Sequence, residues 1–231
     1  MKKSYLIYFI FLTTPLFTFP NTKIHTEKLH ETFLKADSFG NLDDLLFHND
    51  SIHRLNFRYP HERKGLKPYI APALLISGGT ALHFMTDFKE SVHDFTQDNF
   101  AYHGHVDDYI QYAPLAAVYA LNAAGLKGKN NFGNRTAIAA KAMLLNSFLI
   151  DRLKTWTSVT RPDGGSRSFP SGHTSIAFSL AHFMHHEYGD LSHWYSVGAY
   201  STATAVGIMR VAKNAHWISD VVIGAGVGIL A

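Results

Sequence analysis

The chain contains no cysteine among its 231 residues. Disulfide bonds and thiolate zinc sites are therefore excluded, and the absence is compatible with a reducing or an extracytoplasmic compartment. Neither sign of charge predominates, because the formal net charge is only +3. The sequence also has no basic tract of the kind that binds nucleic acid. We therefore expect no nucleic-acid partner. The small positive excess suits an anionic substrate or an anionic membrane surface.

Strand-type alternation of apolar and polar residues is missing as well. From Pro68 onward, six segments instead carry apolar residues at helical spacing, and Gly-rich or charged turns separate them. With 46% hydrophobic residues, the chain can bury one substantial core. We predict an all-α domain over residues 69–231, a six-helix bundle. Its expected helices lie at about 69–86, 109–126, 135–153, 172–187, 194–211 and 215–231.

The first 20 residues have the character of a secretory leader. Lys2 and Lys3 precede an apolar stretch, which is typical of a signal peptide or a signal anchor. No small-x-small cleavage site stands out near Pro20, so cleavage and retention are both compatible with the sequence. Either form predicts export, with the active site facing a bacterial periplasm. Residues 21–68 are polar and predict a peripheral arm with one or two short helices.

Long hydrophobic runs are few beyond the leader. A membrane-spanning helix needs roughly 20 largely apolar residues, whereas the predicted helices are shorter and contain polar groups such as Lys141 and Asn146. Small residues in the segment 224–228 suit close helix packing in either setting. We favour a membrane-embedded bundle over a soluble periplasmic one. The sequence ends at Ala231 inside an apolar helix, which is compatible with a longer native chain, and it does not fix the oligomeric state.

Three short motifs in the last third of the chain supply the parts of a phosphate site. An enzyme that cleaves a phosphate ester without a metal must place fixed cations and N–H donors around the phosphoryl oxygens. Two arginines and one lysine suit a single phosphoryl group, because Arg binds it through a planar fork and Lys acts as a mobile point charge. The motifs are Lys154 with Arg161-Pro162, then Pro170-Ser171-Gly172-His173, and then Arg210 with His216 and Asp220.

The second motif stands directly before an apolar stretch, as the N-terminus of a helix does. Free N–H groups around Ser171 and Gly172 would then bind an anion, and Gly172 would allow a close approach of the backbone. His173 lies at the mouth of this helix, where it can act as the acid that protonates the leaving oxygen.

The third motif supplies a nucleophile. His216 and Asp220 are four residues apart in an expected helix start, so the carboxylate can hold one ring nitrogen and leave the other free to attack phosphorus. Arg210 should close the preceding helix, and His216 should open the next one, because Lys213-Asn214 is typical of a turn. The expected roles are therefore His216 as nucleophile, Asp220 as its orienting group and His173 as general acid and base.

The three motifs resemble the type 2 phosphatidic acid phosphatase and vanadium haloperoxidase superfamily, which includes bacterial acid phosphatases. The family pattern is Lys-x6-Arg-Pro, then Pro-Ser-Gly-His, then Ser-Arg-x5-His-x3-Asp, and residues 105–231 carry the resemblance. Met209 departs from it, standing where the family has Ser. The resemblance implies that Lys154, Arg161, Ser171, Gly172 and Arg210 bind phosphate. It also implies that His216 becomes a phosphohistidine, which water hydrolyses with His173 as base, and that no metal or other cofactor takes part.

Two other polar clusters suggest alternative metal sites. His182, His185 and His186 with Glu187 have a spacing that suits a metal, but a polar helix end explains them better. The segment from His103 to Asp108 could also bind a cation, although it is more typical of a loop. We therefore predict no metal site.

The motifs leave more than one function class open. The leading hypothesis is an exported phosphatase acting on a phosphate ester or pyrophosphate, with lipid phosphates as the substrates that the resemblance implies. The alternatives are a soluble periplasmic non-specific acid phosphatase and a vanadate-dependent haloperoxidase, in which vanadate would be the cofactor and His216 its ligand. A binding or structural protein is disfavoured, because every charged and titrating residue of the motifs is present.

Overall fold

The computed structural model describes residues 65–231, which belong to one compact unit beginning at Lys64. Within the described residues the chain forms eight helices and no strand, so the all-α prediction is confirmed. The predicted leader and nearly all of the predicted polar arm lie outside the described residues. The helices are α3 (Lys67–Phe84), α4 (Thr86–Phe100), α5 (Val106–Ile110), α6 (Ala113–Ala123), α7 (Phe132–Thr157), α8 (Gly172–Tyr188), α9 (His193–Ala212) and α10 (Ile218–Leu230).

Two details of the predicted helices were wrong. The segment expected as one helix over 109–126 is divided, because α5 ends at Ile110 and α6 begins at Ala113 with Pro114 in its first turn. Proline suits a first helical turn, since its missing N–H would have no partner there. Helix α4 was not predicted, because its sequence is polar and only Val92 of it is buried. The other five predicted helices correspond to α3, α7, α8, α9 and α10.

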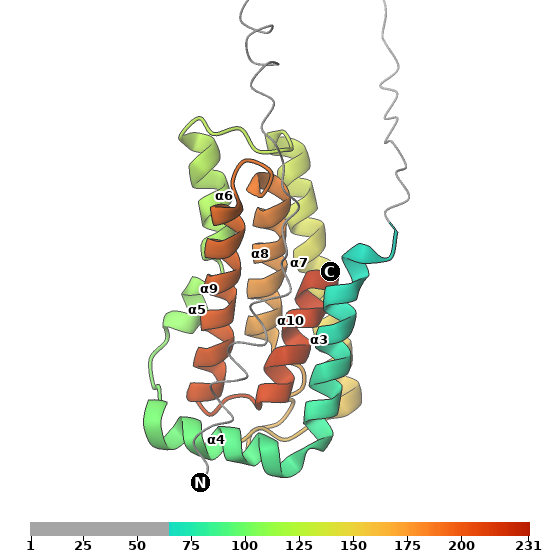
Figure 1. Ribbon diagram of the computed structural model, residues 1–231, viewed down its shortest axis with the longest axis vertical. Coiled ribbons are helices and arrows are strands. Elements are labelled where there is room, and N and C mark those ends of the chain that lie inside the picture. The colour runs from blue at the N-terminus through green and yellow to red at the C-terminus, as the bar shows by residue number, and fades with distance from the viewer. Residues whose placement is uncertain (1–64) are drawn as a thin grey trace, which may run out of the picture. The chain divides into compact units, whose positions relative to one another are not determined.

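Helix α8 forms the centre of the bundle. Figure 1 shows α8 between α6, α7, α9 and α10, with α3 packed beside α10. The main core cluster joins Val118 of α6, Ala139 of α7, Phe183 of α8 and Val206 of α9. No helix among residues 65–231 combines the length and the apolar character that crossing a bilayer requires.

Glycines on α10 set how closely this helix approaches its neighbours. A Cβ atom added at Gly224 would lie 2.6 Å from the Ser171 carbonyl oxygen, and one at Gly228 would lie 2.2 Å from the Ser175 carbonyl oxygen. Both positions therefore require glycine because backbone meets backbone. The prediction of close packing in this stretch is confirmed, and the contact at Ser171 places the start of α8 beside the start of α10.

Helix α4 lies across one end of the bundle, where α9 stops and α10 begins (Figure 1). The Gln97 amide donates to the Val211 carbonyl at 3.1 Å, and the His93 Nε2 atom lies 2.6 Å from the Asn214 side-chain oxygen. Lys89 lies over the Trp217 ring, 4.5 Å from its centroid. These contacts fix the α9–α10 loop, which carries His216 of the third motif.

Candidate active site

The three motifs meet at one end of the bundle, where four helices begin or end (Figure 1). Lys154 lies in the last turn of α7, and His173 is the second residue of α8. Arg210 lies in the last turn of α9, as expected, and Asp220 lies in the first turn of α10. The starts of α8 and α10 present free N–H groups and positive dipole ends, which suit an anion, and the ends of α7 and α9 add the Lys154 and Arg210 cations.

His216 is held by a buried polar network. Its Nδ1 atom lies 3.6 Å from Asp220 Oδ2 and 3.5 Å from the Ser168 hydroxyl. The Ser168 hydroxyl donates to Asp220 Oδ2 at 2.5 Å, and the Trp217 backbone amide donates to the same oxygen at 3.1 Å. The groups that fix the ring are therefore on its Nδ1 side, which leaves Nε2 for chemistry.

His216 does not open α10, contrary to the prediction. The helix begins at Ile218 with Trp217 as its N-cap, so His216 lies one residue before the cap. The His216 ring still lies close to Asp220, because the His216 backbone amide donates to the Arg210 carbonyl at 3.3 Å. The end of α9 thus positions the imidazole that the start of α10 orients.

The His216 ring is neutral at ordinary pH. Its exposure is only 2%, and burial, aided by the Lys154 and Arg210 cations and opposed by Asp220, lowers its pKa to about 4. Burial and nearby cations both disfavour the imidazolium form. A neutral ring carries a lone pair, as a nucleophile must.

Lys154 approaches the site from the end of α7. Its Nζ atom donates to the Arg167 carbonyl at 2.6 Å and lies 3.4 Å from the Ser168 carbonyl oxygen. Burial, together with the Arg161, Arg167 and Arg210 cations, lowers the pKa of Lys154 to about 8, although Asp220 opposes the shift. The amine is therefore still mainly charged near neutral pH. Because Arg161 and Arg210 are among the charges that act on Lys154, the three predicted cations lie in one place.

Two of these cations have an N–H donor without a partner. The Nε atoms of Arg161 and Arg210 are buried and have no hydrogen-bond partner among the described residues. A buried donor without a partner is costly, by about 1–3 kcal/mol, and more for a charged group. The same cost is removed when an anion accepts from these donors.

The start of α8 contributes backbone amides. No side chain caps this helix, and the Ser171 hydroxyl is instead paired with the Thr174 hydroxyl at 2.9 Å. The Ser171 amide donates to the Asp220 carbonyl at 3.0 Å, whereas the amides of the first helical turn, which include those of Gly172 and His173, have no acceptor within the helix. A Cβ atom at Gly172 would lie 4.0 Å from Lys154 Cε, which places this helix start beside the lysine stem.

These residues lie in a region that matches a known family, the PAP2 superfamily, over residues 147–231. The matched residues include all three motifs. The resemblance to this superfamily that the three motifs predicted is confirmed.

Individual relatives cover different shares of the chain. The lipid A 1-phosphatase of Porphyromonas gingivalis is 40% identical over 132 residues, which are 56% of this chain and 30% of the relative. The chain thus spans less than a third of that protein's length.

Among solved structures, the first transmembrane PAP2 type phosphatidylglycerolphosphate phosphatase from Bacillus subtilis aligns with a TM-score of 0.54 and 20% identity, covering 72% of this chain and 92% of that one. It shows the same fold. The crystal structure of Aquifex aeolicus LpxE aligns with a TM-score of 0.45 and 22% identity, covering 60% of this chain and 88% of that one.

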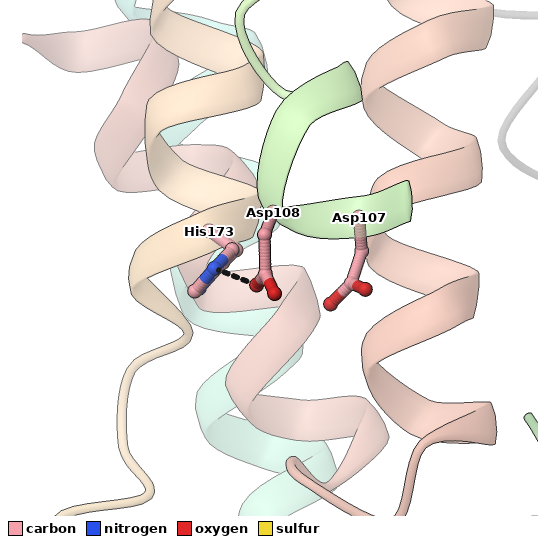
Figure 2. Close-up of side chains that lie close together, drawn as sticks. All are labelled: Asp107, Asp108 and His173. Atoms are coloured by element: carbon pink, nitrogen blue, oxygen red, sulfur yellow. Dashed lines mark hydrogen bonds and ion pairs between the residues drawn. The ribbon is translucent and has the colours of Figure 1, made fainter. Parts of the chain in front are cut away.

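Two carboxylates reach the PAP2 site from outside the matched region. Asp107 and Asp108 lie on the short helix α5, and Figure 2 shows Asp108 in contact with His173 and Asp107 beside it. Arg210 and Lys213 form ion pairs with Asp107. Asp107 is fully buried and accepts hydrogen bonds from Arg210 and from Lys213, the latter at 3.3 Å. Although burial raises it, these two cations hold the pKa of Asp107 below its ordinary value. The motifs contain no signal for this pairing.

Asp107, Asp108 and His173 come close enough together to hold a metal ion. The sequence had suggested a cation site in the segment that contains the two aspartates. In the structure, Arg210 and Lys213 supply the positive charge that a metal would bring. The two carboxylates are thus balanced by side chains of the PAP2 domain.

A groove leads away from the cations. Its volume is about 430 Å³, and it lies between α7, α8 and the loop that joins them. Lys154, Arg161 and Gly172 line its inner end, whereas Ser147 and Ile176 line it farther along the helices. Because the groove contains both apolar and polar side chains, it can accept a larger group attached to a bound phosphate.

The histidine cluster at the far end of α8 is tied into hydrogen bonds. The Nε2 atoms of His182 and His186 lie 3.1 Å apart, and the His185 Nδ1 atom lies 2.7 Å from the Ser196 hydroxyl. Glu187 is not part of this cluster, since its carboxylate pairs with Arg135 at 3.0 Å inside the bundle. Glu187 is therefore not available as a ligand for a metal held by these histidines.

Proposed function

We propose that the chain is an exported, metal-independent phosphatase that hydrolyses a lipid phosphate through a phosphohistidine on His216. The observation that carries this proposal is the pair of buried Nε donors on Arg161 and Arg210, which lack partners among residues 65–231. These donors belong to the cations that surround a neutral, oriented imidazole. Cations with free donors bind a phosphoryl group, and a neutral imidazole beside them can attack it.

The first chemical step transfers the phosphoryl group to the enzyme. The Nε2 lone pair of His216 forms a bond to phosphorus while the bond from phosphorus to the leaving oxygen breaks. His173 gives its proton to that oxygen, so an alcohol departs rather than an alkoxide. Lys154, Arg161 and Arg210 stabilise the charge on the three equatorial oxygens, and the amides of Gly172 and His173 add to them.

The second step returns the enzyme to its starting state. Water attacks phosphorus, His173 takes the proton from that water, and the bond between phosphorus and His216 Nε2 breaks. Inorganic phosphate then leaves. Asp220 holds the Nδ1 side of His216 throughout, so the ring does not turn when its charge changes.

A lipid phosphate is the substrate class that the chain favours. Its relative from Porphyromonas gingivalis is named as a lipid A 1-phosphatase, and the groove beside Lys154 and Arg161 offers space for the group that follows the phosphate. Export would place the site on the periplasmic side of the inner membrane, where such lipids are exposed. The leader-like first 20 residues motivate this placement.

A phosphate-release assay tests the proposal. The purified chain should release phosphate from lipid phosphates in detergent without added metal, and EDTA should not reduce the rate. Vanadate should inhibit, because it adopts the five-coordinate geometry of the transition state. A strict requirement for a divalent metal would contradict the mechanism. Halide oxidation with vanadate and peroxide, without phosphatase activity, would favour a haloperoxidase instead.

His216→Ala tests the nucleophile. Loss of the attacking group should lower kcat by at least about a thousandfold. His186→Ala is the matched control, since His186 is exposed at the other end of α8, and it should retain activity. Rapid quenching of the wild-type chain with a labelled substrate should trap acid-labile phosphate on His216. Equal losses in both variants would overturn the site assignment.

A further inference from the structure

We infer that Asp108 is a positioning residue for His173, and that the site contains two histidine–carboxylate dyads in which opposite ring nitrogens are held. This inference rests on the proposed function, because it assigns the atom through which His173 exchanges its proton. The observation behind it is the contact of 2.8 Å between His173 Nε2 and Asp108 Oδ1 (Figure 2).

The contact determines which nitrogen of His173 is available. A carboxylate accepts only, so the Nε2 atom must carry the hydrogen of this bond. In the neutral ring the lone pair is then on Nδ1, and in the protonated ring the second N–H is on Nδ1. Proton transfer to the leaving oxygen therefore takes place at Nδ1 of His173. In His216 the order is reversed, since Asp220 lies on the Nδ1 side and Nε2 is free.

Helix α5 keeps Asp108 in place. The neighbouring Asp107 is fully buried and bound by Arg210 and Lys213, so the helix is fastened to the end of α9. Asp108 itself also contacts His105 Nδ1, at 3.2 Å. Because Arg210 engages Asp107 through an Nη1 contact, its Nε atom is still available for the phosphate. The Arg210 guanidinium can thus contact both the phosphate and helix α5, which carries the carboxylate that orients His173.

The charges around His173 define the expected pH effect. The groups that face it are Asp107 and Asp108 of α5 and Arg210 of α9. Burial and then Arg210 lower the pKa of His173, while the two carboxylates raise it. Removal of the Asp108 charge should therefore lower that pKa further. Since the acid must be protonated in the first step, the basic limb of the kcat/KM profile should move to lower pH.

Measuring Asp108→Asn with two phosphate esters distinguishes a positioning role for Asp108 from a purely structural one. The kcat/KM value reports only the steps up to departure of the leaving group, which is where His173 acts as an acid. For an alkyl phosphate, whose leaving oxygen needs a proton, we expect kcat/KM to fall about 10- to 100-fold. For dinitrophenyl phosphate, whose leaving group departs as an anion, we expect a change of less than about threefold. Asp98→Asn, at an exposed carboxylate of α4, is the control and should match the wild type with both esters.

An equal loss with both esters, or no loss with either, would overturn the role of Asp108. If wild-type chain released phosphate from neither ester, the proposed function would fail, and the dyad with it. A measurement that needs no variant guards against misfolding. Nitrogen NMR of the wild-type chain, above the pKa of His173, should show the Nε2–H tautomer for His173 and the Nδ1–H tautomer for His216. The Nδ1–H tautomer at His173 would refute the assignment.

Discussion

The Ser168 hydroxyl donates to Asp220 Oδ2 at 2.5 Å, and both residues are fully buried. This bond links the loop before α8 to the first turn of α10. The same hydroxyl lies 3.5 Å from His216 Nδ1, so one serine bears on both members of the nucleophile dyad. Second partners of this kind fix the orientation of an active histidine through its carboxylate.

Ser168→Ala should therefore weaken catalysis more than binding. We expect kcat to fall about 10- to 100-fold because Asp220 loses a donor and the imidazole loses its alignment. KM should change little, since no phosphate ligand is removed. Steady-state kinetics measure both values, and Ser201→Ala, at an exposed position of α9, is the control. A wild-type kcat in Ser168→Ala would show that Asp220 is oriented without this hydroxyl.

The pH dependence should reflect two histidines in opposite states. His216 must be neutral, and burial sets its pKa at about 4, so activity should fall as the pH drops toward that value. His173 must be protonated in the first step, and burial lowers its pKa below the ordinary 6.5. The value of kcat/KM should therefore fall as the pH rises above the pKa of His173. A profile of kcat/KM with a maximum on the acid side of neutrality is expected. A maximum well above neutral pH would contradict these roles.

The groove predicts a substrate-selective variant. Ser147 is exposed on α7 and lines the groove, so Ser147→Trp should fill space that a large leaving group would occupy. We expect kcat/KM for a lipid phosphate to fall at least about tenfold, while p-nitrophenyl phosphate, which is small, is affected less than about threefold. Ser147→Ala should behave as the wild type with both. Equal effects of Ser147→Trp on the two substrates would place the leaving group elsewhere.

Gly224→Ala tests the close approach of α10 to α8. The new Cβ would lie 2.6 Å from the Ser171 carbonyl oxygen, so the helices must separate. Overpacking of this kind costs about 1–3 kcal/mol, and here it also displaces Asp220 from Ser168. We expect a lower melting temperature together with reduced kcat. Gly198→Ala is the control, since a Cβ there meets nothing within 4 Å, and it should be neutral or stabilising. Unchanged stability in Gly224→Ala would contradict the packing described.

The parts of the fold that sequence predicted are those whose signals are local. Helices α7 to α10 carry apolar residues at helical spacing, and the three motifs lie at or next to the ends of these helices, so the sequence pattern could indicate both the helices and the motifs between them. Helix α4 lacks such a stretch and is defined by contacts with the α9–α10 loop, such as Gln97 with Val211. No window of its own sequence contains those partners.

The site shows the same division. The residues of the three motifs could be named because their types and spacing suit phosphate chemistry. Asp107 and Asp108 could not be assigned, because their partners Arg210 and His173 lie far along the chain and only tertiary packing brings them together. Ser168 is adjacent to the second motif, but a serine near a turn is common, and its role depends on Asp220. The contact of His216 with Asp220 forms although His216 lies outside α10.

The position of α5 in the chain has a consequence for how this domain can be transplanted. The family match begins at residue 147, whereas the carboxylate that neutralises the buried Arg210 is on Asp107. Removing one partner of a buried ion pair costs about 3–5 kcal/mol, because the other charge remains in a poorly solvated position. A chimera that received residues 147–231 alone would thus inherit the catalytic motifs together with an uncompensated guanidinium. An exchangeable module must therefore carry α5 along with the motifs.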